Sequence, residues 1–165
     1  MDLPNRKRTR LSEYDYSSPG MYFITICTHN RKCLFGKIKN QQMHLNEMGK
    51  IVDKEILKIE PRYQNIRIDK YVIMPNHIHM IIVILASEGI NPIPTIKYDV
   101  SNVIGKFKAG VSRIVGSAFM HSSKKSIWQS SFHDHIIRGE KDYLKIWNYI
   151  DTNIEKWESD CFYNS

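Results

Sequence analysis

The chain has 165 residues, of which 42% are hydrophobic, enough for one core and too few for two large independent domains. Its 24 Lys and Arg residues outnumber 17 Asp and Glu residues and give a net charge of +7, which suits a polyanionic partner such as a nucleic acid. Three cysteines without CxxC spacing argue against a disulfide framework and a zinc ribbon. Because no apolar run is long enough for a membrane span or a secretory signal, we expect a cytoplasmic protein that does not bind membranes.

The leading residues form a basic segment. Arg6, Lys7, Arg8 and Arg10 fall within five positions, and a Ser-Ser-Pro-Gly turn occupies residues 17–20. We predict a flexible basic arm over residues 1–20 and a single domain over residues 21–165. Either the arm lies on nucleic-acid phosphates through Arg6 and Arg8, or it is a solvated tail.

Hydrophobic patterning predicts the elements that follow. Aromatic and β-branched residues at 21–28 predict a strand. Apolar residues at helical spacing predict a helix over 46–60, which Pro61 ends. Residues 65–74 and 77–85 predict two strands, and the Pro-Asn pair between them predicts a hairpin.

The second half of the chain is expected to add two more helices. Residues 100–119 predict a helix whose polar face carries Lys106, Lys108 and Arg113, either a phosphate-contacting stripe or a solvated face. An aromatic and histidine-rich stretch at 127–138 adds an edge strand or a loop. The last helix is predicted from about residue 141 to 157, with Leu144, Trp147, Ile150 and Ile154 as its apolar stripe. This order predicts an α+β fold, a ferredoxin-like antiparallel sheet with helices packed on one face.

Two histidines interrupt the most apolar predicted strand. Because side chains alternate along a strand, His77 and His79 are expected on one face and Ile78 on the other. Two adjacent imidazoles can hold one divalent cation, which would satisfy polar rings that are costly to bury without a partner. They could also be two hydrogen-bonded histidines that line a pocket.

The last predicted helix carries a tyrosine and an asparagine four residues apart. This spacing places Tyr149 and Asn153 on one helix face, within reach of a common ligand. Tyr149 lies outside the apolar stripe. The alternative is an ordinary interfacial tyrosine and an asparagine at the helix end.

Five segments together resemble the IS200-like single-tyrosine transposases of the HUH type, in particular the REP-associated tyrosine transposases. The resemblance runs in family order across most of the chain from about residue 11. It rests on the segments MYFITICTHNRKCLFG, YVIMPNHIHMIIVI, GKFKAGVSR, IWQSSFHDHIIRGEKDY and YIDTN. The chain departs from the family pattern at Ile154, where a proline usually follows the asparagine.

The resemblance implies a metal-dependent single-strand DNA endonuclease and strand transferase that forms a covalent 5′-phosphotyrosine. Tyr149 would be the nucleophile, and His77, His79 and Asn153 would hold Mg²⁺ or Mn²⁺. The implied partner is single-stranded or hairpin DNA, and the implied location is the bacterial cytoplasm at the nucleoid. It also favours a homodimer, and leaves open whether Tyr149 acts on its own subunit's metal.

For DNA contacts the sequence offers stacking rings and positive charges. Trp128, Phe132 and Arg138 could grip unpaired bases and their backbone, although the two rings could equally belong to the core. Two other functions remain open: a non-catalytic ferredoxin-like nucleic-acid-binding module, and a domesticated repeat-binding protein that no longer cuts. The second His-x-His, His133 and His135, is expected to be structural or to contact DNA.

Overall fold

The computed structural model describes residues 14–86, 98–119 and 126–163. Its centre is an antiparallel sheet of four strands in the order β4-β5-β1-β6. β1 and β5 are the central strands, and helices cover both faces of the sheet there, which explains why β5 is an almost continuous apolar run. The strands are β1 (Gly20–Cys27), β4 (Ile66–Ile73), β5 (His77–Ile84) and β6 (His133–Ile137).

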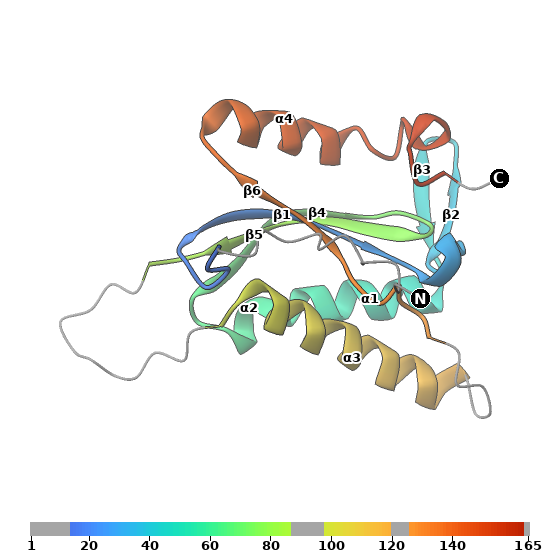
Figure 1. The fold of residues 1–165 in the computed structure, drawn as a ribbon. Coiled ribbons are helices and arrows are strands. Elements are labelled where there is room, and N and C mark those ends of the chain that lie inside the picture. The colour runs from blue at the N-terminus through green and yellow to red at the C-terminus, as the bar shows by residue number, and fades with distance from the viewer. Residues whose placement is uncertain (1–13, 87–97, 120–125, 164–165) are drawn as a thin grey trace, which may run out of the picture.

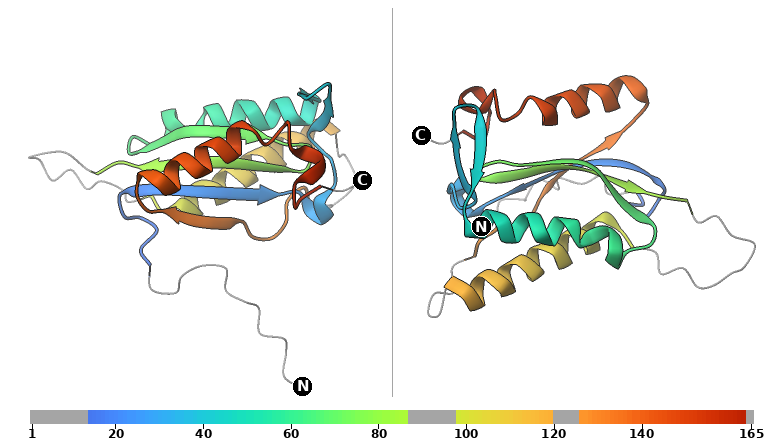
Figure 2. Two further views of the ribbon diagram at one scale, coloured as in Figure 1. Left: turned by 90° about the horizontal axis from the view of Figure 1, so that it is seen from above. Right: turned by 180° about the vertical axis from the view of Figure 1, so that it is seen from behind.

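The helices lie on both faces of this sheet (Figure 1). α1 (Glu47–Leu57), the short α2 (Ile59–Arg62) and α3 (Val100–Phe119) lie together on one face. α4 (Glu140–Asp151) crosses the opposite face obliquely, as Figure 2 shows from above. The succession β1-α1-β4-β5-α3-β6 is the ferredoxin-like arrangement, so the predicted α+β class and antiparallel sheet are confirmed. The sequence predicts helices on one face only, and α4 instead covers the other.

Two cores of unequal size result. The main core lies between the sheet and the α1–α3 layer and includes Ile24, Ile78, Met80, Ile82, Val52, Ile56, Val103, Phe107 and Val111. The second core lies under α4, and its buried residues are Ile81, Ile137, Ile146 and Ile150. Alternation along β5 therefore sends Ile78, Met80, Ile82 and Ile84 to the main core and Ile81 to the second core.

A small hairpin that the sequence does not predict precedes α1. It consists of β2 (Gly36–Lys39) and β3 (Gln42–Leu45), joined by Asn40 and Gln41 with φ of 50° and 58°. Positive φ at both central residues is the conformation that a tight two-residue hairpin requires. Asn46 then caps α1 by accepting a 2.9 Å hydrogen bond from the Gly49 backbone N–H.

Three predicted boundaries differ from the structure. α1 ends at Leu57, and Pro61 lies inside the short α2 instead of ending the helix. α4 ends at Asp151, well before residue 157, and turns followed by a 3-10 helix, η2 (Trp157–Ser159), continue the chain.

The predicted apolar stripe of α4 is also partly wrong. Leu144 and Trp147 are 55% and 38% exposed, whereas Ile146 and Ile150 are the residues that pack on the sheet. Ile150 was predicted to be buried and is, so the error concerns Leu144 and Trp147, whose place in the core Ile146 takes.

Part of the predicted arm packs against the domain. Tyr14 and Tyr16 contact the main core, and their rings lie 6.2 and 6.0 Å from that of Tyr22. Arg6 and Arg8 lie outside the described residues, so the flexible arm and its boundary remain predictions.

Candidate metal and nucleophile site

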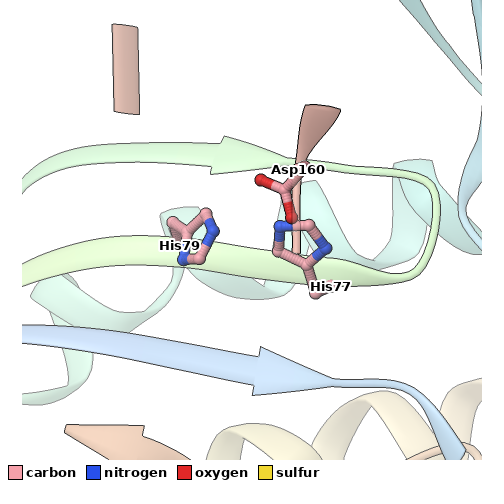
Figure 3. A group of neighbouring side chains, drawn as sticks. All are labelled: His77, His79 and Asp160. Atoms are coloured by element: carbon pink, nitrogen blue, oxygen red, sulfur yellow. The ribbon is translucent and has the colours of Figure 1, made fainter. Parts of the chain in front are cut away.

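The paired histidines of β5 lie on the sheet face that α4 covers. His77 and His79 are 0% and 1% exposed, and their ring centroids are 4.4 Å apart. Ile78 between them packs in the main core on the other face, as the alternation of a strand predicts. Figure 3 shows both imidazoles projecting from β5 beside the carboxylate of Asp160.

The Nδ1 atom of each imidazole already has a partner. His77 Nδ1 lies 2.8 Å from Asn76 Oδ1, and because an amide oxygen only accepts, His77 donates from Nδ1 and keeps a lone pair on Nε2. His79 Nδ1 lies 2.8 Å from the Thr25 hydroxyl, which can accept in the same way. Partners of this kind orient imidazole rings that bind metals through the other nitrogen.

Burial keeps both rings neutral. It lowers the pKa of His77 to about 4 and that of His79 well below its ordinary value. The desolvation of a charged imidazole is the main cause in each case, and the neighbouring His77 adds to the effect on His79. Both rings therefore have the neutral form that a metal ligand requires at pH 7.

The hydroxyl of Tyr149 on α4 reaches this pair. Its oxygen lies 3.2 Å from His79 Nε2, and it donates a 3.2 Å hydrogen bond to Asp160 Oδ2. The tyrosine ring packs edge-on against Phe23 and His79, with centroid distances of 6.0 and 5.1 Å. Burial and the carboxylate of Asp160 raise the pKa of Tyr149 above its ordinary value, so its hydroxyl is protonated at neutral pH. The residue is nevertheless 37% exposed, so a ligand can reach it.

Asn153 also reaches the cluster, but not from the helix that the sequence predicts. It lies two residues beyond the end of α4, in a turn whose backbone N–H bonds to Ile150 O at 3.4 Å. Its side chain is 1% exposed, and Nδ2 donates to Asp160 Oδ2 at 2.9 Å. The turn therefore brings the Asn153 amide into contact with Asp160 of the cluster.

Asp160 is the member of the cluster that the sequence analysis missed. One ligand atom from each of His77, His79 and Asp160 lies within 4.8 Å of the other two. Asp160 follows η2 and is held by the backbone N–H of Phe162, which donates to Oδ1 at 2.7 Å. It stands in a stretch without strand or helix periodicity, so its negative charge was the only signal in the sequence.

The C-terminal segment closes over the histidines. The ring of Phe162 lies 4.7 Å from that of His77 and 5.8 Å from that of His79, and the Arg31 guanidinium lies 5.2 Å from the Phe162 ring centroid. The buried amide of Asn76 donates from Nδ2 to Phe162 O and to Arg31 O, at 2.8 and 3.1 Å. One side chain thus fixes His77, the loop at Arg31 and the C-terminal segment.

Comparisons with known proteins identify the fold. No family model matches the chain. An uncharacterized protein of Haemophilus influenzae is 40% identical over 173 residues, which cover 98% of this chain and 94% of that protein, so the two belong to one family. A REP-associated tyrosine transposase solved with a REP hairpin is 25% identical, with a TM-score of 0.62 over 88% of this chain and 74% of that one. The chain has the fold of an IS200-like single-tyrosine transposase. A proposed transposase of Deinococcus radiodurans shares this fold at 16% identity, with a TM-score of 0.51 over 87% of this chain and 95% of that one.

The donor atoms in this transposase fold suit a divalent cation. His77 Nε2 and Asn153 Oδ1 are buried and have no hydrogen-bond partner among the described residues. Leaving such an atom unpaired costs about 1 to 3 kcal/mol, which a bound cation would recover. Two imidazole nitrogens with amide or carboxylate oxygens match Mn²⁺ well, and Mg²⁺ through the oxygens.

The predicted DNA-contacting residues are not gathered around this site. Lys106 and Arg113 are exposed on α3, on the other face of the sheet. Lys108 donates to Gln129 O and Ser131 O at 2.6 and 3.2 Å, so its amine is engaged within the chain. Arg138 is exposed just before α4.

The two predicted stacking rings of the transposase fold lie in its main core. Trp128 and Phe132 are 5% and 6% exposed, and the Trp128 indole N–H donates to Lys108 O at 3.0 Å. Of the two interpretations that the sequence allows, the structure places them as core residues. In the second His-x-His, His135 pairs with Asp142 at 2.8 Å, away from the cluster. Among the described residues no helix is both long and apolar enough to cross a membrane.

Proposed function

We propose that the chain is a metal-dependent single-strand DNA endonuclease and strand transferase that acts through Tyr149. The observation that carries the proposal is the 3.2 Å contact between the Tyr149 hydroxyl and His79 Nε2, beside a group of side chains whose donor atoms lie close enough together to hold one metal ion. A tyrosine in a structural role does not need this neighbour. Both residues belong to one chain, which supports attack by Tyr149 at the metal site of its own subunit.

The chain supplies the metal ligands and the nucleophile from separate elements. His77 and His79 would hold Mg²⁺ or Mn²⁺ with Asn153, and Asp160 is a further carboxylate within reach. When bound, the cation would withdraw charge from the scissile phosphate. Tyr149 then attacks phosphorus, the O3′ atom leaves as a hydroxyl, and a 5′-phosphotyrosine bond forms. A second 3′-hydroxyl can reverse this step and join a different strand.

Asp160 is placed to assist the attack. The Tyr149 hydroxyl is protonated at neutral pH and already donates to Asp160 Oδ2, so this oxygen is the nearest carboxylate for its proton. A carboxylate that binds the cation directly is less basic. The two roles therefore compete, and Asp160→Asn separates them, since it keeps an oxygen ligand and loses the proton acceptor.

The proposed substrate is unpaired DNA beside a hairpin. One structural neighbour is described as bound to a REP hairpin, and the net charge of +7 suits a phosphate backbone. Lys106, Arg113, Arg138 and the arm residues Arg6 and Arg8 are proposed to contact phosphates. Affinity should then fall steeply with salt.

The decisive experiment is a covalent-adduct assay. The purified chain is incubated with Mn²⁺ and end-labelled hairpin DNA that carries random unpaired flanks, and protein-linked label is measured on a denaturing gel. We expect an adduct with the natural chain, none in EDTA and none with Tyr149→Phe. Tyr143→Phe, on the same helix, is the matched control, because its hydroxyl bonds to Asp69 away from the cluster.

Two results would contradict the proposal. An adduct that persists in Tyr149→Phe would show that another residue is the nucleophile. Binding of hairpin DNA without any adduct in Mn²⁺ or Mg²⁺ would instead indicate a repeat-binding protein that no longer cuts.

A further inference from the structure

A hollow lined by several polar side chains lies beside the metal and nucleophile site. Its volume is about 770 Å³, within the range of small-molecule pockets. It adjoins the site through Arg31, whose guanidinium packs on the Phe162 ring that covers His77. Its main lining residues are His29, Asn30, Arg31, Gln129, Ser130 and Tyr163.

The hollow offers hydrogen-bonding groups that the described part of the chain does not use. The side chains of Asn30, Gln129 and Ser130 are exposed and have no hydrogen-bond partner among the described residues. The Tyr163 ring, 41% exposed, adds an aromatic surface. Amides, a hydroxyl and an aromatic ring together are the groups that bind a nucleobase by its edge and its face.

The walls of the hollow are fixed by backbone contacts. The His29 N–H donates to Ile127 O at 2.8 Å, and the Gln129 N–H donates to Cys27 O at 3.0 Å. The two segments therefore stay together without a ligand. The buried indole of Trp128 forms the floor between them.

The loop at one wall has an unusual conformation. Asn30 and Arg31 have φ of 55° and 53°, in the left-handed region that side chains other than glycine rarely adopt. Asn76 holds this loop by its bond to Arg31 O. Strained backbone of this kind persists where the surrounding structure fixes it, and it gathers at ligand sites.

We propose that this hollow binds one unpaired nucleotide next to the scissile phosphate. The amides of Asn30 and Gln129 bind the edge of the base, Tyr163 stacks on its face, and Arg31 binds the adjoining phosphate. The inference rests on the proposed function, because it takes single-stranded DNA as the substrate. It adds that this hollow selects the base at one flanking position.

The test is a binding selection that needs no cleavage. A pool of hairpin oligonucleotides with eight randomised unpaired positions is bound to the full chain in EDTA, and the retained fraction is sequenced. We expect the natural chain to enrich one base at a single position by tenfold or more. Gln129→Ala should reduce that enrichment to less than threefold, because a lost base contact relaxes specificity at its own position. Gln64→Ala, an exposed glutamine after α2, is the matched control and should keep it.

Arg31 and Tyr163 give a second measurement. Arg31→Ala should weaken binding of every retained sequence by a similar factor and lower the salt dependence by about one phosphate contact. Tyr163→Phe should bind as the natural chain does, and Tyr163→Ala should bind more weakly, because the ring supplies the stacking surface.

The outcomes separate this inference from the proposed function. If the natural chain forms an adduct and enriches a base that Gln129→Ala and Asn30→Ala enrich equally well, the hollow does not select it and the inference is overturned. The proposed function then stands. If no position of the pool is enriched, the inference is also overturned, whatever the adduct assay shows. Loss of enrichment in both amide variants, with Gln64→Ala unchanged, supports it even if no adduct forms.

Discussion

The two faces of the sheet differ in what they bury. The face under α1 and α3 holds the large apolar core, whereas the face under α4 buries four isoleucines beside two histidines. β5 contributes to both: Ile78, Met80 and Ile82 point to the first, and His77, His79 and Ile81 to the second. The core on the first face therefore contributes most of the hydrophobic stabilisation of the fold. The second face can hold buried polar groups, whose burial costs stability.

The largest expected effect is a loss of stability when a buried isoleucine of β5 is truncated, and two neighbouring residues allow the two cores to be compared. Ile82→Ala and Ile81→Ala both truncate side chains that are 0% exposed. We expect Ile82→Ala to lower the free energy of unfolding by about 4 kcal/mol and Ile81→Ala by about 2 kcal/mol, because the smaller core can collapse around the lost atoms. Urea denaturation measures both. Equal losses would mean that the two cores stabilise the fold alike.

The next effect is the acid sensitivity of the α4 face. Burial lowers the pKa of folded His77 to about 4, whereas the unfolded chain takes up this proton near pH 6.5. The unfolded state therefore binds the proton first as the pH falls. The contribution of neutral His77 to stability is present above pH 6.5 and is lost as the pH drops toward 4. The loss from His77 is roughly 3 kcal/mol by pH 4.

Denaturation in EDTA across this pH range checks the sign and the size. His77→Gln should flatten the slope between pH 6.5 and 4, and His44→Gln, at an exposed position on β3, should leave it as it is. A slope that is the same in all three proteins would assign the acid sensitivity to other groups.

The smallest expected effect is a loss of metal affinity when His79 loses its hydrogen-bond partner Thr25. Thr25→Val removes the hydroxyl that lies 2.8 Å from His79 Nδ1 and keeps the shape of the side chain. Mn²⁺ affinity should fall about 10- to 100-fold, as expected when a ligand loses the partner that orients it. Thr25→Ser should keep most of the affinity. Titration calorimetry at pH 7 measures both, and an unchanged Thr25→Val would exclude an orienting role.

Periodicity in the sequence was enough to predict the main strands and helices and the alternation within β5, but not that α4 covers the second face of the sheet. The alternation in β5 placed His77 and His79 on one face, and the apolar spacing at residues 100–119 predicted α3 (Val100–Phe119). These signals are local, since each depends on the geometry of one element. Their success explains why the fold class could be predicted.

Features set by tertiary contacts were not predicted. Asp160 joins the site because a turn and a 3-10 helix fold the chain back over β5, and neither has a periodic signal. Of the predicted stripe of α4, Ile150 is buried as expected, whereas Leu144 and Trp147 are exposed and Ile146 packs on the sheet in their place. The Asn40-Gln41 turn of the hairpin did carry a signal, because asparagine is suited to positive φ. The two strands that it joins are too short and too polar to show a clear pattern in the sequence.

The amide of Asn76 has an evolutionary consequence. Its oxygen accepts from His77 Nδ1 and so determines which nitrogen of His77 carries the proton. Its Nδ2 donates to the backbone carbonyls of Arg31 and Phe162. A substitution here cannot alter one of these contacts and spare the others. Because two of these contacts go to backbone carbonyls, which every residue carries, the side chains at positions 31 and 162 are free to vary with respect to this amide, whereas position 76 should stay asparagine among relatives.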